Sequence, residues 1–336
     1  MPTPQPVPTA SPTPETGSYI APPETQPFPT SPFDDRVNSP QYLANSSTMI
    51  ARALNGDDFY LGKIQVSTHD LSTSTDGQTT VYVAHRSDPR YTIHCMYYSH
   101  CPLEGKIVNI PVGALPGGNL GFKDFHDTGH DDQHMAVRNT DTQIETDMWL
   151  TPTPNGIGGT LNIGYGGAFP FSSGGIGKGG ATAAGFALTQ GRARPADLIA
   201  GRIPYALSLA TPCENGHVYP AYGDDGGHDA GCPPIGSHVW LDSSPSEIAN
   251  SGADRYFQII LNALHEYGGF IGDRCDCNLS VAAEGGLAYQ AFGLPNPWAQ
   301  ILAHFPDETP SGPSGEYHLL VRTGNIDLSA HLHVIK

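Results

Sequence analysis

Apolar residues alternate with polar ones in many short stretches of this chain, and this pattern predicts β-strands. Alternation places every second side chain on a core face, whereas a helix repeats every three to four residues. Turn-forming residues, such as the Asp-Gly at 76–77, separate several of these stretches. The predicted strands are residues 59–66, 79–85, 91–98, 106–110, 203–210, 270–273, 317–321 and 331–335.

Helical periodicity is limited to three segments. The longest predicted helix, residues 252–267, begins with a capping-box-like pair, Ser251 and Asp254, and ends at two glycines. Shorter helices are predicted at 39–54 and 194–201. The apolar stripe of the long helix must pack on a sheet. It consists of Phe257, Ile260, Leu261 and Leu264.

Two segments rich in charged and aromatic residues predict a β-hairpin at the functional centre of the protein. Residues 131–137 and 145–149 flank a short run of turn-forming residues. If the turn centres on residues 140–141, His134 lies opposite Asp147. Alternation then gathers on one face of the hairpin Asp132, His134, Glu145, Asp147 and Trp149. The other, apolar face holds Met135, Val137, Ile144 and Met148.

This clustering predicts a surface that binds and cleaves sugars, with an indole on which a sugar ring stacks. Two alternatives stay open. A bulged turn would shift one strand by a residue and separate the cluster. The same pattern also fits an ordinary hairpin with a solvated polar face, on which His134 and Asp147 form an exposed pair.

Composition narrows the class of protein. The 336 residues include 40 glycines and 31 prolines, which suits short strands and turns. The 33 acidic and 16 basic residues give a formal net charge of −17, which argues against a nucleic-acid partner because such partners bind basic surfaces. No apolar run approaches the ~20 residues that span a bilayer, so we expect no membrane partner.

The six cysteines are spaced as local disulfides that close loops. This spacing favours pairing Cys95 with Cys101 and Cys213 with Cys232. Cys275 and Cys277 are too close for a relaxed bridge, so each pairs elsewhere or the two form a strained one. Zinc is the rival use, but the chain has no C-x2-C pair. Disulfides indicate an oxidising, extracellular location.

The N-terminal residues form a Pro/Thr/Ser tract that cannot bury a core. We therefore predict a disordered linker at 1–32 and a single catalytic-type β-sandwich domain at 33–336. Pro/Thr linkers typically tether the modules of secreted polysaccharide-degrading enzymes, so we expect a secreted monomer tethered to other modules. The glycines within 161–185 are expected to let the backbone run close to a sheet or a ligand.

A series of short motifs runs from residue 132 to the C-terminus. They are D-x-H-M-x-V at 132–137, D-M-W at 147–149, A-T-A-A-G-F at 181–186, G-R-I-P-Y-A-L at 201–207, Y-P-A at 219–221, L-x-x-Y-G at 264–268, G-D at 272–273 and the final H-V-I-K. In this order they resemble a family of secreted bacterial proteins of actinobacterial and acidobacterial type. The resemblance covers about residues 33–336.

The resemblance implies a mostly-β fold and a glycanase-like activity. The expected architecture is an antiparallel β-sandwich or jelly roll, with one long amphipathic helix and a few short helices packed on it. The family commonly has a histidine where this chain has Tyr205. If that histidine is catalytic in the family, Tyr205 takes its place as an acid or ligand, or the activity is altered.

Glycoside hydrolysis is the first functional hypothesis, with an extracellular polysaccharide as substrate. It requires two carboxyl groups, about 5–5.5 Å apart for retention of configuration or about 6.5–9.5 Å apart for inversion. The expected catalytic residues are Asp132, His134 and Asp147, with Glu145 and Asp273 as partners. The expected substrate-binding residues are Trp149, Tyr205 and Tyr219.

Two other functions remain as alternatives. A polysaccharide lyase would use His134 or Tyr205 as its base and a cation from the cluster Arg192, Arg194 and Arg202 to neutralise a uronate. A carbohydrate-binding or adhesive module would hold a glycan without cleaving it. A serine hydrolase is disfavoured because the chain lacks G-x-S-x-G.

The acidic and histidine-rich stretch before the hairpin is a candidate metal site. Asp127 and Asp131 are the expected ligands of a structural calcium. The histidine spacing fits no zinc motif, and the expected hydrolytic chemistry requires no cofactor.

Overall fold

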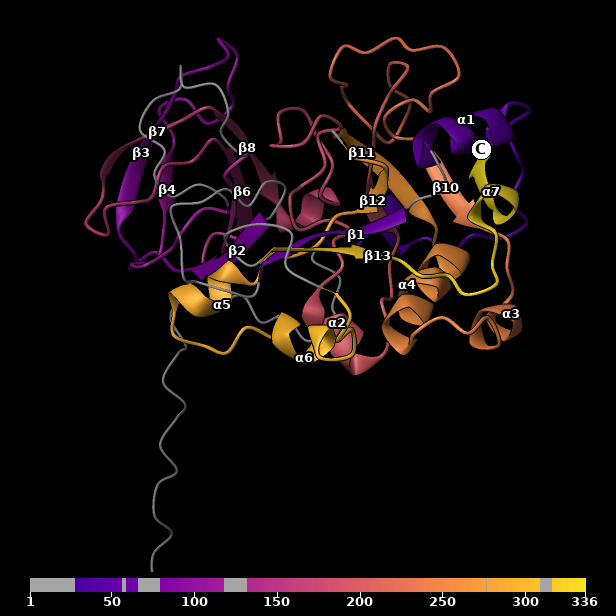
Figure 1. The fold of residues 1–336 in the computed structure, drawn as a ribbon. Coiled ribbons are helices and arrows are strands. Elements are labelled where there is room, and N and C mark those ends of the chain that lie inside the picture. The colour runs from indigo at the N-terminus through magenta and orange to yellow at the C-terminus, as the bar shows by residue number, and fades with distance from the viewer. Residues whose placement is uncertain (1–27, 56–58, 66–78, 118–131, 276, 309–315) are drawn as a thin grey trace, which may run out of the picture.

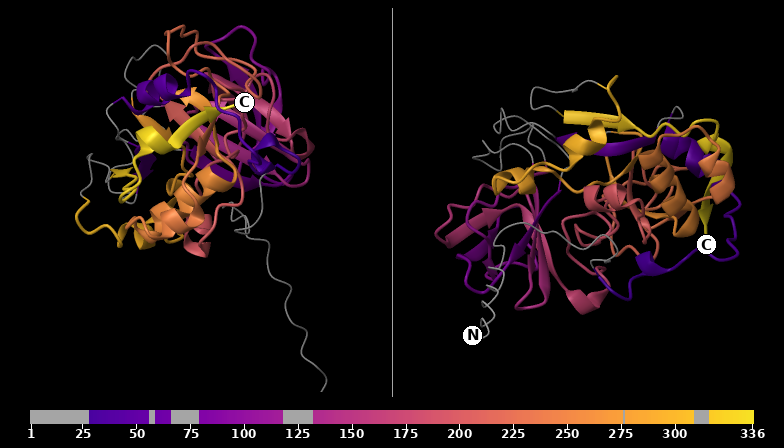
Figure 2. Two further views of the ribbon diagram at one scale, coloured as in Figure 1. Left: turned by 90° about the vertical axis from the view of Figure 1, so that its right-hand side faces the viewer. Right: turned by 90° about the horizontal axis from the view of Figure 1, so that it is seen from below.

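The structure is a computed structural model that describes residues 28–55, 59–65, 79–117, 132–275, 277–308 and 316–336. In these residues, three β-sheets and a set of short helices form a mixed α/β fold (Figure 1). Two of the sheets lie at one end of the molecule, and the third lies with most of the helices at the other end (Figures 1 and 2).

The largest sheet has seven strands. In spatial order these are β13 (Glu316–Leu320), β1 (Phe59–Gln65), β12 (Leu279–Val281), β9 (Leu207–Thr211), β11 (Gly269–Arg274), β10 (His238–Leu241) and β14 (Leu332–Ile335). β1 runs parallel to β12 and β9 runs parallel to β11. The remaining neighbours are antiparallel.

The other two sheets pack face to face. The four-stranded sheet contains β2 (Thr79–Ala84), β5 (His134–Asn139), β6 (Ile144–Trp149) and β8 (Tyr165–Pro170). The three-stranded sheet contains β4 (Ile107–Asn109), β3 (Arg90–Cys95) and β7 (Gly159–Ile163). One apolar cluster joins them, with Tyr82, Met135, Val137 and Met148 from the first and Tyr91, Ile93, Leu161 and Ile163 from the second.

The expectation of antiparallel sheets is wrong for part of every sheet. β2 pairs parallel to β5 and β3 pairs parallel to β7, in addition to the two parallel pairs of the large sheet. None of the three sheets closes on itself within the described residues, so the jelly roll is not confirmed. Alternation along a strand shows which side chains face the core, but it carries no information on the direction of the neighbouring strand.

Helix α4 (Arg255–Glu266) confirms the predicted apolar stripe, because Phe257, Ile260, Leu261 and Leu264 are all buried in the large core. It is shorter than expected and its start differs. The cap is Asp254, whose side chain accepts from the backbone N–H of Tyr256. Ser251 instead bonds the backbone of Ile248 and Ala253, so the proposed capping box is wrong.

The other helices are short. They are α1 (Ser46–Leu54), α2 (Pro195–Ala200), α3 (Pro245–Ala249), α5 (Leu287–Ala291), α6 (Trp298–Leu302) and α7 (Leu328–His331), with 3-10 turns η1 (Pro32–Asp34) and η2 (Phe171–Ser173). Both shorter predicted helices are present as α1 and α2, but α1 begins at Ser46 rather than at residue 39. The predicted strands are confirmed as well, and the largest shift is at β9, which begins at Leu207 rather than at residue 203.

The glycine-rich segment forms β7 and β8, which alternation did not predict. A Cβ atom at Gly166 would lie 2.3 Å from the carbonyl oxygen of Asp147, and one at Gly167 would lie 1.5 Å from that of Gly179. No side chain fits at such distances, so the expected close approach of backbones is confirmed at these two positions.

The folded part of the chain includes residues that the sequence assigned to the linker. The Phe28 side chain is fully buried and packs edge-on against Phe169 and Phe171. The earlier part of the predicted linker, residues 1–27, lies outside the described residues.

Candidate active site

The predicted hairpin is formed by β5 and β6, but its register is shifted by two residues. Ala136, not His134, lies opposite Asp147. The turn is four residues long, residues 140–143, and the side-chain oxygen of Asn139 accepts hydrogen bonds from two of its backbone amides. Because a shift of two leaves every side chain on its face, the predicted separation into a polar and an apolar face is confirmed.

The polar face is buried, so the alternative of an exposed, solvated pair is wrong. Asp147 is 0% exposed and His134 is 5% exposed. The backbone carbonyl of Ala181 bonds the His134 ring, and the backbone N–H of Leu188 bonds the Asp147 carboxyl. This face therefore lies between the four-stranded sheet and a second layer of chain.

Glu145 is held by a complete set of partners. Its carboxylate contacts the guanidinium of Arg138 and accepts hydrogen bonds from the backbone N–H and the hydroxyl of Thr189, at 3.1 and 2.7 Å. The Arg138 guanidinium also lies 4.2 Å from the centre of the Phe171 ring. Glu145 and Arg138 thus form a buried ion pair between β5 and β6. Through Thr189, this pair also joins the two strands to the segment that covers them.

Asp147 is also enclosed by protein. One carboxyl oxygen accepts a hydrogen bond of 2.7 Å from the backbone N–H of Leu188. The other has no hydrogen-bond partner among the described residues. Burial and the neighbouring Glu145 raise the pKa of Asp147 well above its ordinary value. Neither carboxyl lines the pocket described next.

A pocket of about 650 Å³ lies where the large sheet meets the start of β5. Its lining includes Asp132, His134, Arg192 and Asp273, which converge from separate parts of the chain, and also the charged Arg274. Three of these are expected catalytic residues. Polar groups of Asn55, Tyr60, Thr182, Ser208, Asn278 and Ser280 complete much of the lining.

His134 lines the pocket, and one of its ring nitrogens is unprotonated and buried. Its Nε2 lies 3.0 Å from the carbonyl oxygen of Ala181, and because a carbonyl only accepts, Nε2 carries the proton. Nδ1 is then a lone-pair acceptor, and it has no hydrogen-bond partner among the described residues. Burial, assisted by the positive charge of Arg192, lowers the pKa of His134 although Asp132 opposes this shift. The ring is therefore neutral near pH 7.

Asp132 is oriented by the indole at the end of β6. The Nε1–H of Trp149 donates a hydrogen bond of 2.9 Å to one carboxyl oxygen of Asp132. The backbone carbonyl of Asp132 also accepts from the N–H of Leu150 at 2.8 Å. These two bonds fix the carboxyl group at the pocket.

Asp273 reaches the same pocket from β11. The strand pairing is irregular between Ile271 and Asp273, which breaks the simple alternation next to the site. Burial, then the carboxyls of Asp225 and Asp132, raise the pKa of Asp273 well above its ordinary value. Asp273 therefore keeps its proton at pH values where an ordinary aspartate has lost it.

Arg192 supplies the positive charge at the centre of the site. Its side chain is only 7% exposed, and its Nε–H donates to the carbonyl oxygen of Leu188. No described residue accepts a hydrogen bond from its two terminal nitrogens. Burial lowers the pKa of Arg192 to about 10, against the effect of four surrounding carboxyl groups, so the guanidinium stays charged at neutral pH.

The other predicted site residues are not brought to the pocket. Tyr205 is fully buried, and its hydroxyl contacts Asp197 and lies 2.9 Å from the carbonyl oxygen of Arg192. Tyr219 is 77% exposed on the surface. The expected calcium ligands Asp127 and Asp131 lie outside the described residues. Among the described residues, no group of three or more His, Cys, Asp or Glu side chains is arranged to hold a metal ion.

The sequence hypothesis for hydrolysis omitted Arg192 and the hydroxyl-bearing residues of the pocket. Arg192 stood out only as one member of an arginine cluster, and burial separates it from its neighbours. Arg194 forms a buried ion pair with Asp197 in the core, and Arg202 is more than half exposed. Ser208 and Ser280 lie on strands of the large sheet and carry no local signal of function.

Three disulfides are present: Cys95–Cys101, Cys213–Cys232 and Cys275–Cys277. The first two pairings are those predicted from spacing, and the third is the strained alternative. Cys275 and Cys277 also line the pocket. The three bridges fit an extracellular or other oxidising location. No helix among the described residues is both long and apolar enough to span a bilayer.

Neither a family model, a curated protein nor a solved structure matches this chain.

Proposed function

We propose that this protein is a secreted glycoside hydrolase that cleaves an extracellular polysaccharide at the pocket of Asp132, His134, Arg192 and Asp273. One observation carries the proposal: two carboxyl groups, Asp132 just before β5 and Asp273 on β11, line one pocket, and burial raises the pKa of Asp273. A protonated carboxyl beside a second carboxyl is the combination that acid-catalysed glycoside cleavage requires.

In the proposed reaction, Asp273 donates its proton to the glycosidic oxygen while the bond from that oxygen to the anomeric carbon breaks. In one route Asp132 removes a proton from the water that attacks the anomeric carbon. In the other, Asp132 attacks that carbon itself to form an ester, and water that gives a proton back to Asp273 then attacks the same carbon and releases Asp132. The separation of the two carboxyl groups in the complex selects between these routes. The terminal nitrogens of Arg192 donate to sugar oxygens.

The test is the release of reducing ends from a panel of soluble polysaccharides. The wild-type protein should release them from at least one member, and Asp132→Asn should lower the rate by about 10²–10⁴-fold, the usual contribution of general acid–base or nucleophilic carboxylates. Asp141→Asn, an exposed carboxyl in the turn of the same hairpin, is the matched control and should keep full activity. No release from any member, or full activity in Asp132→Asn, would refute the proposal.

A polysaccharide lyase is the second candidate, and a specific observation favours it. His134 lines the pocket and its lowered pKa keeps the ring neutral, as a base requires, and the two terminal nitrogens of Arg192, which donate to no described residue, suit a uronate carboxylate. Hydrolysis ranks first because the pocket holds two carboxyl groups, Asp132 and Asp273, as acid-catalysed cleavage requires, and because Asp132 near the guanidinium opposes an anionic sugar. A lyase would produce an unsaturated uronate with ultraviolet absorbance, whereas a hydrolase would not.

A non-catalytic binding module remains the outcome if neither product forms. In that case the protein would co-sediment with a polysaccharide without shortening it.

A further inference from the structure

An exposed group of aromatic side chains lies next to the pocket. Tyr97 is 54% exposed and Tyr98 is 55% exposed, on the loop that the Cys95–Cys101 disulfide closes. Their rings contact Trp149 at centroid distances of 5.4 and 6.4 Å, and Tyr98 also contacts Tyr165 at 5.5 Å. We call Tyr97, Tyr98 and Trp149 the aromatic platform.

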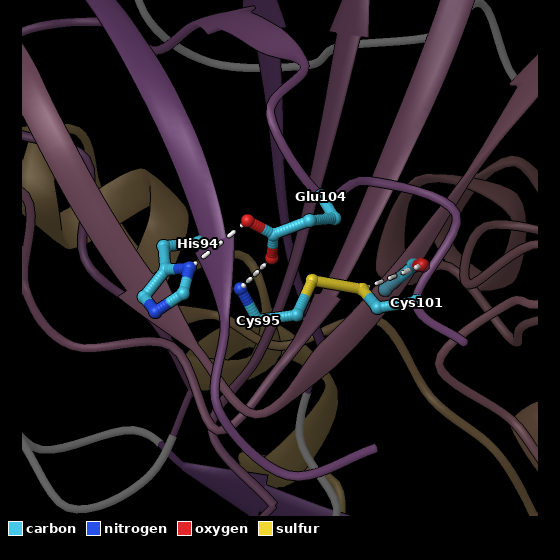
Figure 3. Close-up of a disulfide and its surroundings, with 5 residues drawn as sticks. His94, Cys95, Cys101 and Glu104 are labelled. Atoms are coloured by element: carbon cyan, nitrogen blue, oxygen red, sulfur yellow. Dashed lines mark hydrogen bonds and ion pairs between the residues drawn. A yellow bond between two sulfur atoms is a disulfide. The ribbon is translucent and has the colours of Figure 1, made fainter. Parts of the chain in front are cut away.

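The platform is fixed in place by its loop. The Tyr97 backbone N–H bonds the carbonyl oxygen of Gly164 at 3.1 Å, and the neighbouring Met96 bonds Ile163 at 2.8 Å. At the base of the loop, Glu104 accepts from the backbone N–H of Cys95 at 2.7 Å, beside the disulfide (Figure 3). A ligand that binds to the tyrosines therefore loses little free energy in ordering the loop.

The platform is joined directly to the proposed catalytic group. The indole of Trp149 donates its hydrogen bond to Asp132, while the ring itself lies 22° from parallel to that of Tyr98. The two ring faces thus point in nearly the same direction. Trp149 therefore links Asp132 of the pocket to the ring of Tyr98, while Tyr97 lies edge-on to Trp149 at 82°.

The exposed rings suit a glycan better than a protein partner. Fully burying an aromatic side chain covers about 150–250 Å², so two half-exposed tyrosines and one indole offer a few hundred Å², well below the about 800 Å² per partner of a stable protein complex. Sugar rings need only one flat apolar face each. The three platform side chains carry no charge, which favours a neutral glycan.

We propose that the aromatic platform is a second carbohydrate subsite, on which neutral sugar units of the polysaccharide stack beside the cleavage pocket. The inference rests on the proposed function for the identity of the substrate, but it concerns binding alone. It implies an enzyme that holds its substrate on several units along the chain and prefers polymers to short oligosaccharides.

Affinity electrophoresis with three neutral polysaccharides, hydroxyethylcellulose, xylan and galactomannan, tests the platform separately from catalysis. Asp273→Asn serves as the parent protein because it should bind without cleaving. We expect at least one polysaccharide to retard this parent. Adding Tyr97→Ala and Tyr98→Ala should weaken that retardation at least tenfold, as expected when stacking rings are removed.

Two matched variants keep this test decisive. Tyr97→Phe with Tyr98→Phe preserves both rings and should bind as the parent does. Tyr222→Ala removes another half-exposed tyrosine and should also have no effect. Absence of retardation in all three gels, or unchanged retardation in the double alanine variant, would overturn the platform. Cleavage by the Asp273→Asn parent would instead refute the proposed catalytic role while leaving the binding result valid.

Discussion

Two sets of buried charged groups share the same layer of this protein, and they differ in how fully they are bonded. At the middle of the hairpin, Glu145 is satisfied by Arg138 and Thr189. At its end, Nδ1 of His134 and the terminal nitrogens of Arg192 have no hydrogen-bond partner among the described residues. Both sets lie on one face, yet only the second lines a pocket.

The difference teaches that charge and burial alone do not identify an active site. A buried ion pair with all of its partners stabilises the junction of two layers once it has formed, because removing one member leaves the other unpaired. Buried groups with unused donors and acceptors beside a cavity are instead available to a ligand. The hairpin therefore contains a structural half and a functional half.

The largest expected effect on stability comes from breaking the structural half. Glu145→Gln removes the carboxylate that contacts the buried Arg138 guanidinium, and we expect it to lower the free energy of unfolding by about 3–5 kcal/mol. Urea denaturation measures this loss. Glu308→Gln, which breaks the exposed pair of Glu308 with Arg322, is the control and should cost at most about 1 kcal/mol. Equal losses in the two variants would remove the distinction between buried and surface pairs.

A smaller, pH-dependent effect is expected at Asp147. Its pKa is raised in the folded protein above the ordinary 3.8, so the wild type loses stability as pH rises from 3.8 through the folded pKa, by at most about 1.4 kcal/mol per pH unit. Asp147→Asn lacks this ionisation. The stability of the variant relative to the wild type should therefore increase between pH 5 and pH 8, measured by urea denaturation. A relative stability independent of pH would show that Asp147 is not protonated in the fold.

The smallest effect concerns the stability of the functional half. Asp273→Asn removes a carboxyl whose ionisation is opposed by burial and by Asp225 and Asp132, so we expect it to stabilise the protein by about 1 kcal/mol at pH 7. A thermal melt should show a slightly higher midpoint than for the wild type. A clear loss of stability would indicate that Asp273 belongs to the structural set.

Much of the local structure follows from the sequence. Alternation with a period of two identifies the strands and both faces of the hairpin, and it survives the change in register because the four-residue turn shifts the pairing by an even number. The exact partner of Asp147 could not be predicted, since Asn139 determines the turn through its own side-chain bonds. Glycine-rich β7 and β8 lack the alternation that would reveal them.

The site was predictable only in part. Asp132, His134 and Asp273 were expected to take part in catalysis, and all three line the pocket. Asp147 and Glu145 belong to the same sequence pattern but are covered by residues 188 and 189, which no local pattern places above the hairpin. Arg192 and Asp273 reach the pocket through contacts between segments far apart in the chain. The spacing of apolar residues predicts local structure, but it does not predict such long-range contacts.

The most direct test of this account compares kcat/KM of Asp273→Asn and Asp147→Asn on the same polysaccharide, with each variant confirmed as folded by its thermal melt. The account predicts a loss of at least about 100-fold for Asp273→Asn and a value within about threefold of the wild type for Asp147→Asn, because Asp147 does not line the pocket and burial raises its pKa, which favours a neutral form that an amide resembles. A large loss for Asp147→Asn with full activity for Asp273→Asn would contradict it.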